Sequence, residues 1–196
     1  MKNPIVRRAL SALLATGLLA GCSAAQQYYR LSADGPAPAA ARGASVGVGP
    51  IALPGYVDRA ELVFQSNANQ FQIPGNVHWA GTLQDNIART LAADLARRRG
   101  WGNVASYPWD AAVAGTLRYQ VVLNVRQFHA VSGVGAILET TWTIENPRAG
   151  RGVIVRQGNV NFQEPIIGDG YGPVVAAESR LIARLADEIA RALPAR

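Results

Sequence analysis

The chain has 196 residues, of which 49% are hydrophobic and 16% are charged, with one cysteine and a formal charge of +6. This length and composition suit one globular domain with a sizeable core and exclude an intrinsically disordered chain. No arginine-rich run is interleaved with aromatic residues, so the basic balance does not indicate nucleic-acid binding.

The N-terminus has the layout of a secretory signal peptide over residues 1–21. The cations Lys2, Arg7 and Arg8 precede an apolar run over residues 9–20 that ends in small residues. A run of about 12 residues spans roughly 18 Å as a helix, which is too short for a bilayer core of about 30 Å. Removal of the three cations would leave 16 positive side chains against 13 acids, or a net +3.

The end of this segment, Leu19-Ala20-Gly21-Cys22, looks like the lipobox of bacterial lipoproteins. The single cysteine of the chain stands at the one position where a lipoprotein needs it. We therefore predict covalent lipid on Cys22, and no other cofactor, in preference to an ordinary secreted protein with a stray cysteine. An acylated Cys22 leaves no thiol for a disulfide, so packing alone must hold the domain together.

A lipidated tether and connector is predicted over residues 22–43, and a single domain over residues 44–196. Five residues separate Cys22 from Tyr28, so this link reaches at most about 20 Å. If residues 28–31 pack on the domain, the folded body lies close to the membrane surface.

Short elements are predicted in the first half of the domain. Residues 45–53 read as a strand limited by Pro50 and Pro54, and residues 56–59 as a turn. Residues 61–73 form a plausible hairpin, and residues 103–106 a short strand.

The first long helix is predicted over residues 77–99, with Asn76 or Thr82 as its cap and Gly100 as its stop. Its apolar residues recur every four positions: Leu83, Ile87, Leu91 and Leu95. The three arginines 97–99 in its last turn favour the helix dipole, and we interpret them as a solvated helix end in preference to an anionic-lipid contact.

Three alternating stretches, 115–128, 136–144 and 153–162, predict an antiparallel meander with one solvent-facing side. The apolar parity changes within the third stretch, which predicts a bulge near Gly158. A glycine-rich loop over residues 164–172 precedes the final helix, with Pro173 in its first turn. The apolar stripe of that helix is Val175, Ser179, Ile182, Leu185, Ile189 and Leu193.

These elements predict a single α/β domain. One mixed sheet carries the first strand and the late meander, and the two long helices pack on it. The strand at 45–53, the first helix and the strand at 103–106 would form a right-handed crossover.

Catalytic and metal-binding patterns are not evident. The loop from Gly168 to Pro173 precedes a helix but lacks the Lys-Ser/Thr of a P-loop, so a loop without phosphate chemistry is favoured. His78 and His129 have no close ligand neighbours, so no metal site is predicted. No serine stands in a nucleophile elbow.

The chain resembles the ABC-transport auxiliary lipoproteins of the PqiC type, which are periplasmic partners of MCE-protein lipid transporters. The resemblance rests on the lipobox, on the order and spacing of short motifs, and on the meander and final helix. The motif residues are Cys22, Tyr28, Tyr29, Leu31, Pro54, Tyr56, Arg59, Trp79 and Leu83.

The resemblance implies a non-enzymatic subunit that docks to an MCE-domain protein and to ABC and permease components on other chains, contributes to envelope integrity, and can form a ring of identical subunits. Ser23 follows Cys22 where an Asp would retain a lipoprotein in the inner membrane. The expected location is therefore the periplasmic face of the outer membrane.

The predicted partner surface is a sheet edge, the hairpin at 61–73, or the loops 131–137 and 165–173. Apolar Val134, Ile166 and Ile167 lie in these loops, where they are either exposed for contact or tucked beneath. Two alternatives remain: another outer-membrane assembly lipoprotein, LptE-like or pilotin-like, and, with less support, a lipid-anchored periplasmic hydrolase.

Overall fold

The computed structural model describes residues 25–36, 45–150 and 152–194. Its helices are α2 (Leu83–Arg99), α3 (Ala111–Thr116) and α4 (Tyr171–Ala192). Its strands are β1 (Gln27–Tyr29), β2 (Val46–Ala52), β3 (Phe64–Asn67), β4 (Gln70–Gln72), β5 (Val77–Trp79), β6 (Val104–Ser106), β7 (Tyr119–Val131), β8 (Gly135–Glu145) and β9 (Ile154–Glu164).

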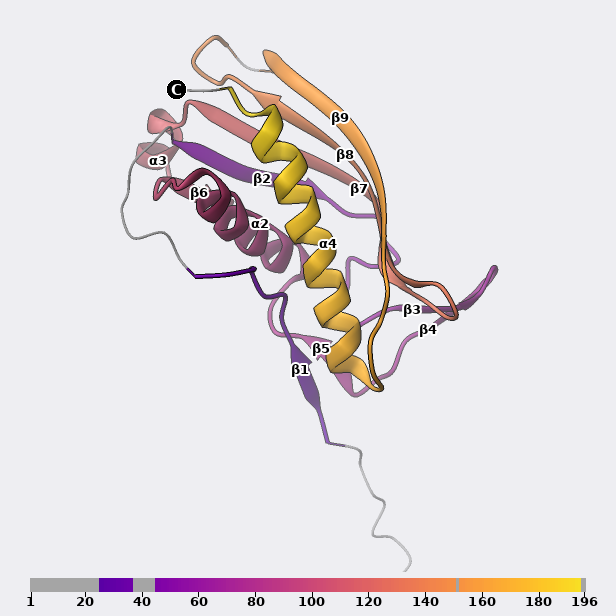
Figure 1. The fold of residues 1–196 in the computed structure, drawn as a ribbon. Coiled ribbons are helices and arrows are strands. Elements are labelled where there is room, and N and C mark those ends of the chain that lie inside the picture. Colours follow the sequence, from indigo (N-terminus) through magenta and orange to yellow (C-terminus); the bar gives the residue numbers. More distant parts are fainter. Residues whose placement is uncertain (1–24, 37–44, 151, 195–196) are drawn as a thin grey trace, which may run out of the picture.

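A curled mixed sheet carries the two long helices, α2 and α4, which contact each other on one of its faces (Figure 1). The strands run in the order β4-β3-β7-β2-β6, and β8 and β9 continue the sheet from the other edge of β7. Strands β1 and β5 form a separate parallel pair. The predicted α/β architecture is therefore confirmed, with the two long helices on one mixed sheet.

Strand β7 is the centre of the sheet. Antiparallel β8 covers one edge along its length, while β2 and β3 run parallel to the other edge, one after the other. The side chains predicted to share one face of the first meander strand are all buried: Leu117, which precedes β7, and Tyr119, Val121, Leu123 and Val125 within it. Alternation along the chain thus correctly identified the face that the helices cover.

The first long helix begins six residues later than predicted. Residues 77–79 form β5, and the chain then turns at Gly81, whose φ of 97° is in the left-handed region. Thr82 is the N-cap, and its hydroxyl accepts the Asp85 N–H at 3.0 Å, so Asn76 is not the cap. Residues 77–79 pair with β1 and are therefore extended, so the helix predicted to start at residue 77 starts later. Residue patterns alone do not show this pairing.

Residues 111–116 are a helix that the sequence analysis missed. Asp110 caps α3 by accepting the Val113 N–H at 2.8 Å, and β7 starts only at Tyr119. Short helices with no buried residue leave no apolar stripe, so periodicity does not reveal α3.

The predicted irregularity in the third meander strand exists, but at a different residue. Ile144 pairs with Arg156 and Glu145 with Ile154, which places the bulge at Val155. Gly158 keeps the regular register opposite Trp142, and the indole covers it so closely that an added Cβ would lie 2.5 Å from the ring. Glycine at 158 therefore serves packing and not a bulge.

Strands β2 and β6 are parallel with α2 between them in the chain, as the predicted crossover requires. Gly100 ends α2 in the left-handed conformation with φ of 61°. None of the helices in the described ranges has the length and apolar character needed to cross a bilayer.

The three arginines at the end of α2 are not a solvated helix end. Arg98 bridges Asp94 and Asp187 of α4. Arg99 donates to the carbonyl oxygens of Ala190 and Pro194 and lies 4.5 Å over the Trp101 ring. Cations at the end of α2 therefore join it to the carboxyl end of α4.

The segment from β1 to Asp34, which we call the N-terminal strap, is held by side chains of both long helices. Its backbone donates three hydrogen bonds: Leu31 N–H to Asn86 Oδ1 at 3.3 Å, Ser32 N–H to Ser179 Oγ at 3.1 Å, and Asp34 N–H to Asp94 Oδ1 at 2.8 Å. The Leu31 side chain is itself buried in the core. The strap is therefore an integral part of the domain.

Burial raises the pKa of the Asp94 carboxyl, even though the Asp34 amide, Arg98 and Arg97 favour its ionised form. Asn86 is fully buried and uses both ends of its amide, because it also donates to the carbonyls of Ala80 and Thr82. Because both ends of this buried amide are hydrogen-bonded, it fixes the strap in one position.

We expect Asn86→Ala to lower the free energy of unfolding by about 2–3 kcal/mol, because the Leu31 N–H and the Ala80 carbonyl lose a buried partner. Urea denaturation measures this loss, and hydrogen exchange at Leu31 should accelerate. The matched control is Asn69→Ala in the exposed turn between β3 and β4, which should change stability by less than about 0.5 kcal/mol. Unchanged exchange at Leu31 would show that Asn86 does not hold the strap.

Candidate functional site

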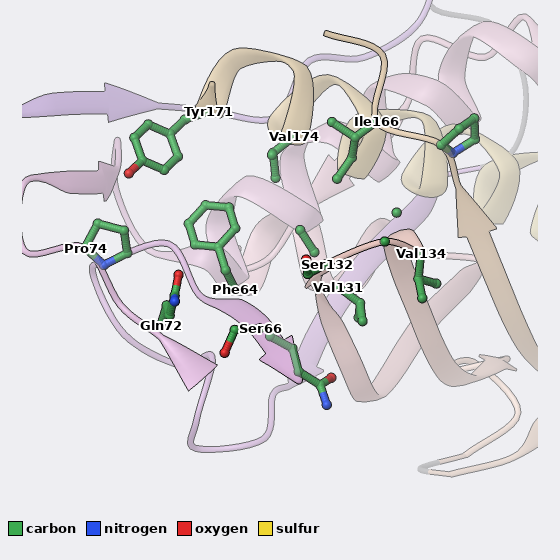
Figure 2. Close-up of a pocket in the computed structure, with 15 residues that line it drawn as sticks. Phe64, Ser66, Gln72, Pro74, Val131, Ser132, Val134, Ile166, Tyr171 and Val174 are labelled. Atoms are coloured by element: carbon green, nitrogen blue, oxygen red, sulfur yellow. The ribbon is translucent and has the colours of Figure 1, made fainter. Parts of the chain in front are cut away.

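The three segments predicted as partner surfaces meet at one end of the molecule and line a single groove (Figure 2). The hairpin β3–β4, the turn between β7 and β8, and the loop before α4 form its walls, and its volume is about 580 Å³. It is lined by Phe64, Gln65, Ser66, Gln72, Pro74, Ala130, Val131, Ser132, Gly133, Val134, Gly135, Pro165, Ile166, Tyr171 and Val174. We call this part of the molecule, together with β1, the groove end.

A row of aromatic rings joins the elements on the helix side of the groove. Tyr171, the first residue of α4, has its ring centre 5.4 Å from that of Phe64 on β3 and 6.3 Å from that of Tyr29 on β1. Tilted and edge-on aromatic pairs of this kind contribute to stability beyond their buried area. The start of α4 is thereby attached to both the hairpin and the strap.

A second aromatic cluster fixes the hairpin to the outer face of β7. The rings of Tyr56, Phe71 and His129 lie 4.9 to 5.5 Å apart. Tyr56 Oη is 3.0 Å from His129 Nδ1, and His129 Nε2 is 3.0 Å from Gln65 Oε1. Burial lowers the pKa of His129 and is the main cause that raises the pKa of Tyr56.

These partners suit a neutral imidazole. Its Nε2–H donates to the Gln65 carbonyl oxygen, and its Nδ1 accepts from the Tyr56 hydroxyl. Within the described residues no group of three or more His, Cys, Asp or Glu side chains is arranged to hold a metal ion. His129 therefore acts as a buried structural link between Tyr56 and the hairpin.

Of the three apolar loop residues predicted to be either exposed or tucked beneath the loops, one is half-buried and two are exposed. Ile166 is half-buried and packs against the core, whereas Val134 is 45% exposed and Ile167 is 77% exposed. Arg180 donates to the Pro165 carbonyl at 2.6 Å and forms an ion pair with Glu164, so the start of the loop is attached to α4. Ile167 is thus presented to solvent from a loop whose base is fixed.

Gly135 brings the β7–β8 turn close to this loop. Its φ is 125°, and a Cβ built there would lie well inside contact distance of the Glu164 carbonyl oxygen. Only glycine combines that backbone angle with this approach. The turn and the loop therefore form one continuous wall of the groove.

Glu178 lies one helical turn beyond Val174 and is fully buried. Its Oε2 has no hydrogen-bond partner in the described part of the chain. Burial raises the pKa of its carboxyl to about 8. The sequence analysis did not single out Glu178, although its position among the apolar residues of the final helix would have indicated a buried acid.

The motif residues of the family resemblance do not form one cluster. Tyr28 is exposed and stacks on His78, while Leu31, Trp79 and Leu83 are core residues. Tyr29 and Tyr56 belong to the two aromatic clusters beside the groove. The Pro54 carbonyl accepts from Val57 in a turn, Arg59 pairs with Glu61, and Cys22 lies outside the described residues.

We expect the stability of the protein to fall as the pH rises from about 4.3 to about 8, because of Glu178. In this window the folded protein keeps a proton that an unfolded glutamate, with a pKa of about 4.3, has released. The free energy of unfolding therefore loses at most about 1.4 kcal/mol per pH unit from this group, and the loss ends above the folded pKa. Glu178→Gln removes the titration, so its advantage over the parent should grow from pH 5 to pH 8 in urea denaturation.

The matched control is Glu188→Gln on the same helix, since Glu188 is half-exposed and paired with Arg191. Its stability should follow the parent at every pH. A Glu178→Gln variant that also follows the parent would show that Glu178 is ionised, or solvated, in the folded protein.

Comparison with known proteins gives a family and a fold. Residues 29–190 match the family model described as ABC-type transport auxiliary lipoprotein component. No curated protein sequence matches the chain. A solved structure of an uncharacterized protein aligns with a TM-score of 0.65 at 23% identity, covering 85% of this chain and 97% of the other. A protein from Xanthomonas campestris aligns with a TM-score of 0.64 at 14% identity, covering 83% and 92%. At these identities the two structures support the fold alone.

Proposed function

Since the chain belongs to the family of ABC-type transport auxiliary lipoprotein components, we propose that it is a non-enzymatic adaptor of a transporter that moves phospholipid or related hydrophobic molecules across the cell envelope. The family match over residues 29–190 is the observation that carries this proposal. The partners are an MCE-domain protein and the permease and ATPase of the transporter, all on other chains. This assignment includes the contribution to envelope integrity that the resemblance implies.

The adaptor is attached to the membrane by lipid on Cys22. Two acyl-chain signals hold a protein stably at a bilayer, whereas one chain gives only marginal binding. Four residues separate Cys22 from Gln27, the first residue of β1, so the body stays within about 18 Å of its anchor. With Ser23 after the cysteine, the location is the periplasmic face of the outer membrane.

The protein partner docks on the free edge of β9. This strand has 11 residues and, within the described ranges, pairs only with β8. Long unpaired edges are sites for strand addition, and natural proteins protect them with charge or proline. Between Ile154 and Phe162 this edge has one charged residue, Arg156, and no proline, while Arg184 occupies the Gln163 carbonyl at its end.

We expect Cys22→Ala to release the protein from the membrane fraction into the periplasm, because the thiol that carries the acyl chains is removed. Fractionation of cell envelopes followed by immunoblotting measures the distribution. A variant that remains with the membranes would show that lipid on Cys22 is not the anchor.

The matched control for that experiment is Ser23→Asp, which keeps the acylated cysteine. This variant should stay with the membranes but move from the outer to the inner membrane on a density gradient, in a host with enterobacterial-type sorting. An unchanged position would contradict the outer-membrane assignment.

We expect affinity purification of the full-length protein from membranes to recover an MCE-domain protein together with bound lipid. The double variant Asn159→Lys, Asn161→Lys changes two exposed residues of β9. It should reduce this recovery about tenfold or more, because charge at a free edge opposes strand addition. Mass spectrometry identifies the partner and the lipid. The control is the double variant Thr141→Lys, Thr143→Lys on β8, whose two edges are paired with β7 and β9.

Recovery of only a secretin, or only a lipopolysaccharide translocon, would overturn the transport assignment. If purification recovers only further copies of this chain, and the β9 variant no longer recovers them, the edge would be assigned to a homo-oligomer contact instead. Equal losses with the β8 and β9 variants would show that charge on the sheet face, and not the free edge, affects binding.

A further inference from the structure

We propose that the groove end of the molecule lies directly against the lipid bilayer, with Ile167 and Val134 in the interfacial layer. This inference rests on the proposed attachment of lipid to Cys22. It assigns a lipid surface as the partner of the groove end and leaves the edge of β9 to the protein partner.

Exposed apolar side chains gather at the groove end. Val134 lines the groove, Ile167 follows the lining residue Ile166, and Phe71 and Ile73 lie on or directly after the hairpin that forms its wall. Tyr28, on β1, is 66% exposed. Several exposed apolar side chains at one end of a domain favour contact with a partner, and the aromatic ring of tyrosine suits the boundary between water and lipid.

The groove end is also nearly free of charge. The chain has no Lys, Arg, Asp or Glu in residues 62–84 or 127–138, and only Asp169 in residues 165–177. Several charged side chains at its border are paired, as Glu164 is with Arg184 at 2.8 Å and Arg59 is with Glu61 at 2.9 Å, while Arg30, directly after β1, is exposed. Contact with lipid at this end therefore desolvates few unpaired charges.

The position of β1 brings this end to the membrane. Gln27 donates to the Asn76 carbonyl at 2.8 Å, and Tyr29 contacts Tyr171 beside the groove. The chain thus enters the fold at the groove end (Figure 1), no more than about 18 Å from Cys22. Because the strap is hydrogen-bonded to α2 and α4, this entry point cannot move freely around the domain.

The opposite end of the molecule differs in charge. It carries Arg98, Arg99 and Arg191 around the ends of α2 and α4, and Val153 and Ile154 are exposed there at the start of β9. Ile154 pairs with Glu145, whereas the groove wall at Glu164 pairs with Ala136, so the two ends lie about 30 Å apart along β8. Ile154, an exposed isoleucine at the far end, therefore serves as the control position for Ile167.

The test uses the chain from Cys22 onward, which contains every core residue, coupled through its single thiol to vesicles of phosphatidylcholine that contain a maleimide-bearing lipid and brominated phosphatidylcholine. Bromine quenches indole fluorescence at close range. We compare Ile167→Trp and Ile154→Trp with the parent protein, whose own tryptophans give the same background in each case.

We expect the indole added at 167 to lose fluorescence roughly twofold or more relative to unbrominated vesicles, because an interfacial contact buries side chains about 5–10 Å into the headgroup region. The indole added at 154 should match the parent. No added quenching at 167, or equal quenching at 167 and 154, would overturn the proposal.

A second set of vesicles contains phosphatidylglycerol, which would attract the arginine end. Quenching at 154 and not at 167 in these vesicles would assign the membrane contact to the arginines and overturn the proposal. Quenching at 167 in both lipids would exclude an effect of the anionic headgroup.

Chemical coupling supplies the anchor here, so the result does not depend on lipidation in cells. If 167 is quenched while Cys22→Ala remains with the membranes in cells, the bilayer contact stands and the natural anchor is a different one. If 167 is not quenched while Cys22→Ala is released, the anchor stands and the bilayer contact is wrong.

Discussion

The hydrogen bonds between the N-terminal strap and the two long helices determine how the rest of the molecule is presented. Asn86 and Asp94 on α2 and Ser179 on α4 accept three backbone N–H groups of the strap. These acceptors are buried, so an unmade bond would leave a polar group without water or a partner. The N-terminal segment therefore enters the domain at one defined end, and under the proposed lipidation of Cys22 this entry point orients the fold relative to the anchor.

The two ends of the sheet differ in chemistry as a consequence of where the chain reverses. Glycine, amide and apolar residues make the turns and the hairpin at the groove end, where the backbone approaches itself closely. The arginines at the other end join the two long helices. Arg98 forms ion pairs with Asp94 and Asp187, and Arg99 donates to a carbonyl at the end of α4. The two ends of the sheet therefore differ in charge, and the edge of β9, which within the described ranges pairs only with β8, runs between them.

Much of the fold was predictable because it depends on local alternation. The meander strands and both long helices show clear periods of two or about four residues, and in β7, β8, α2 and α4 the residues with those periods are buried as expected. In the third meander strand only Val160 is buried, since Val155 and Phe162 are half-buried and Val153 is exposed. Strand β5 and helix α3 escaped prediction for opposite reasons. The former depends on pairing with a distant strand, β1, and the latter buries no side chain.

By itself the sequence determined the class of protein, a single α/β domain of the transport auxiliary lipoprotein family. Only the tertiary structure decided that the loops 131–137 and 165–173 line one groove, that Ile167 is exposed while Ile166 is half-buried, and that the buried Glu178 has an Oε2 without a hydrogen-bond partner among the described residues. Periodicity reports which face of an element is apolar. It does not report which elements meet, because that depends on strand order and register between residues far apart in the chain.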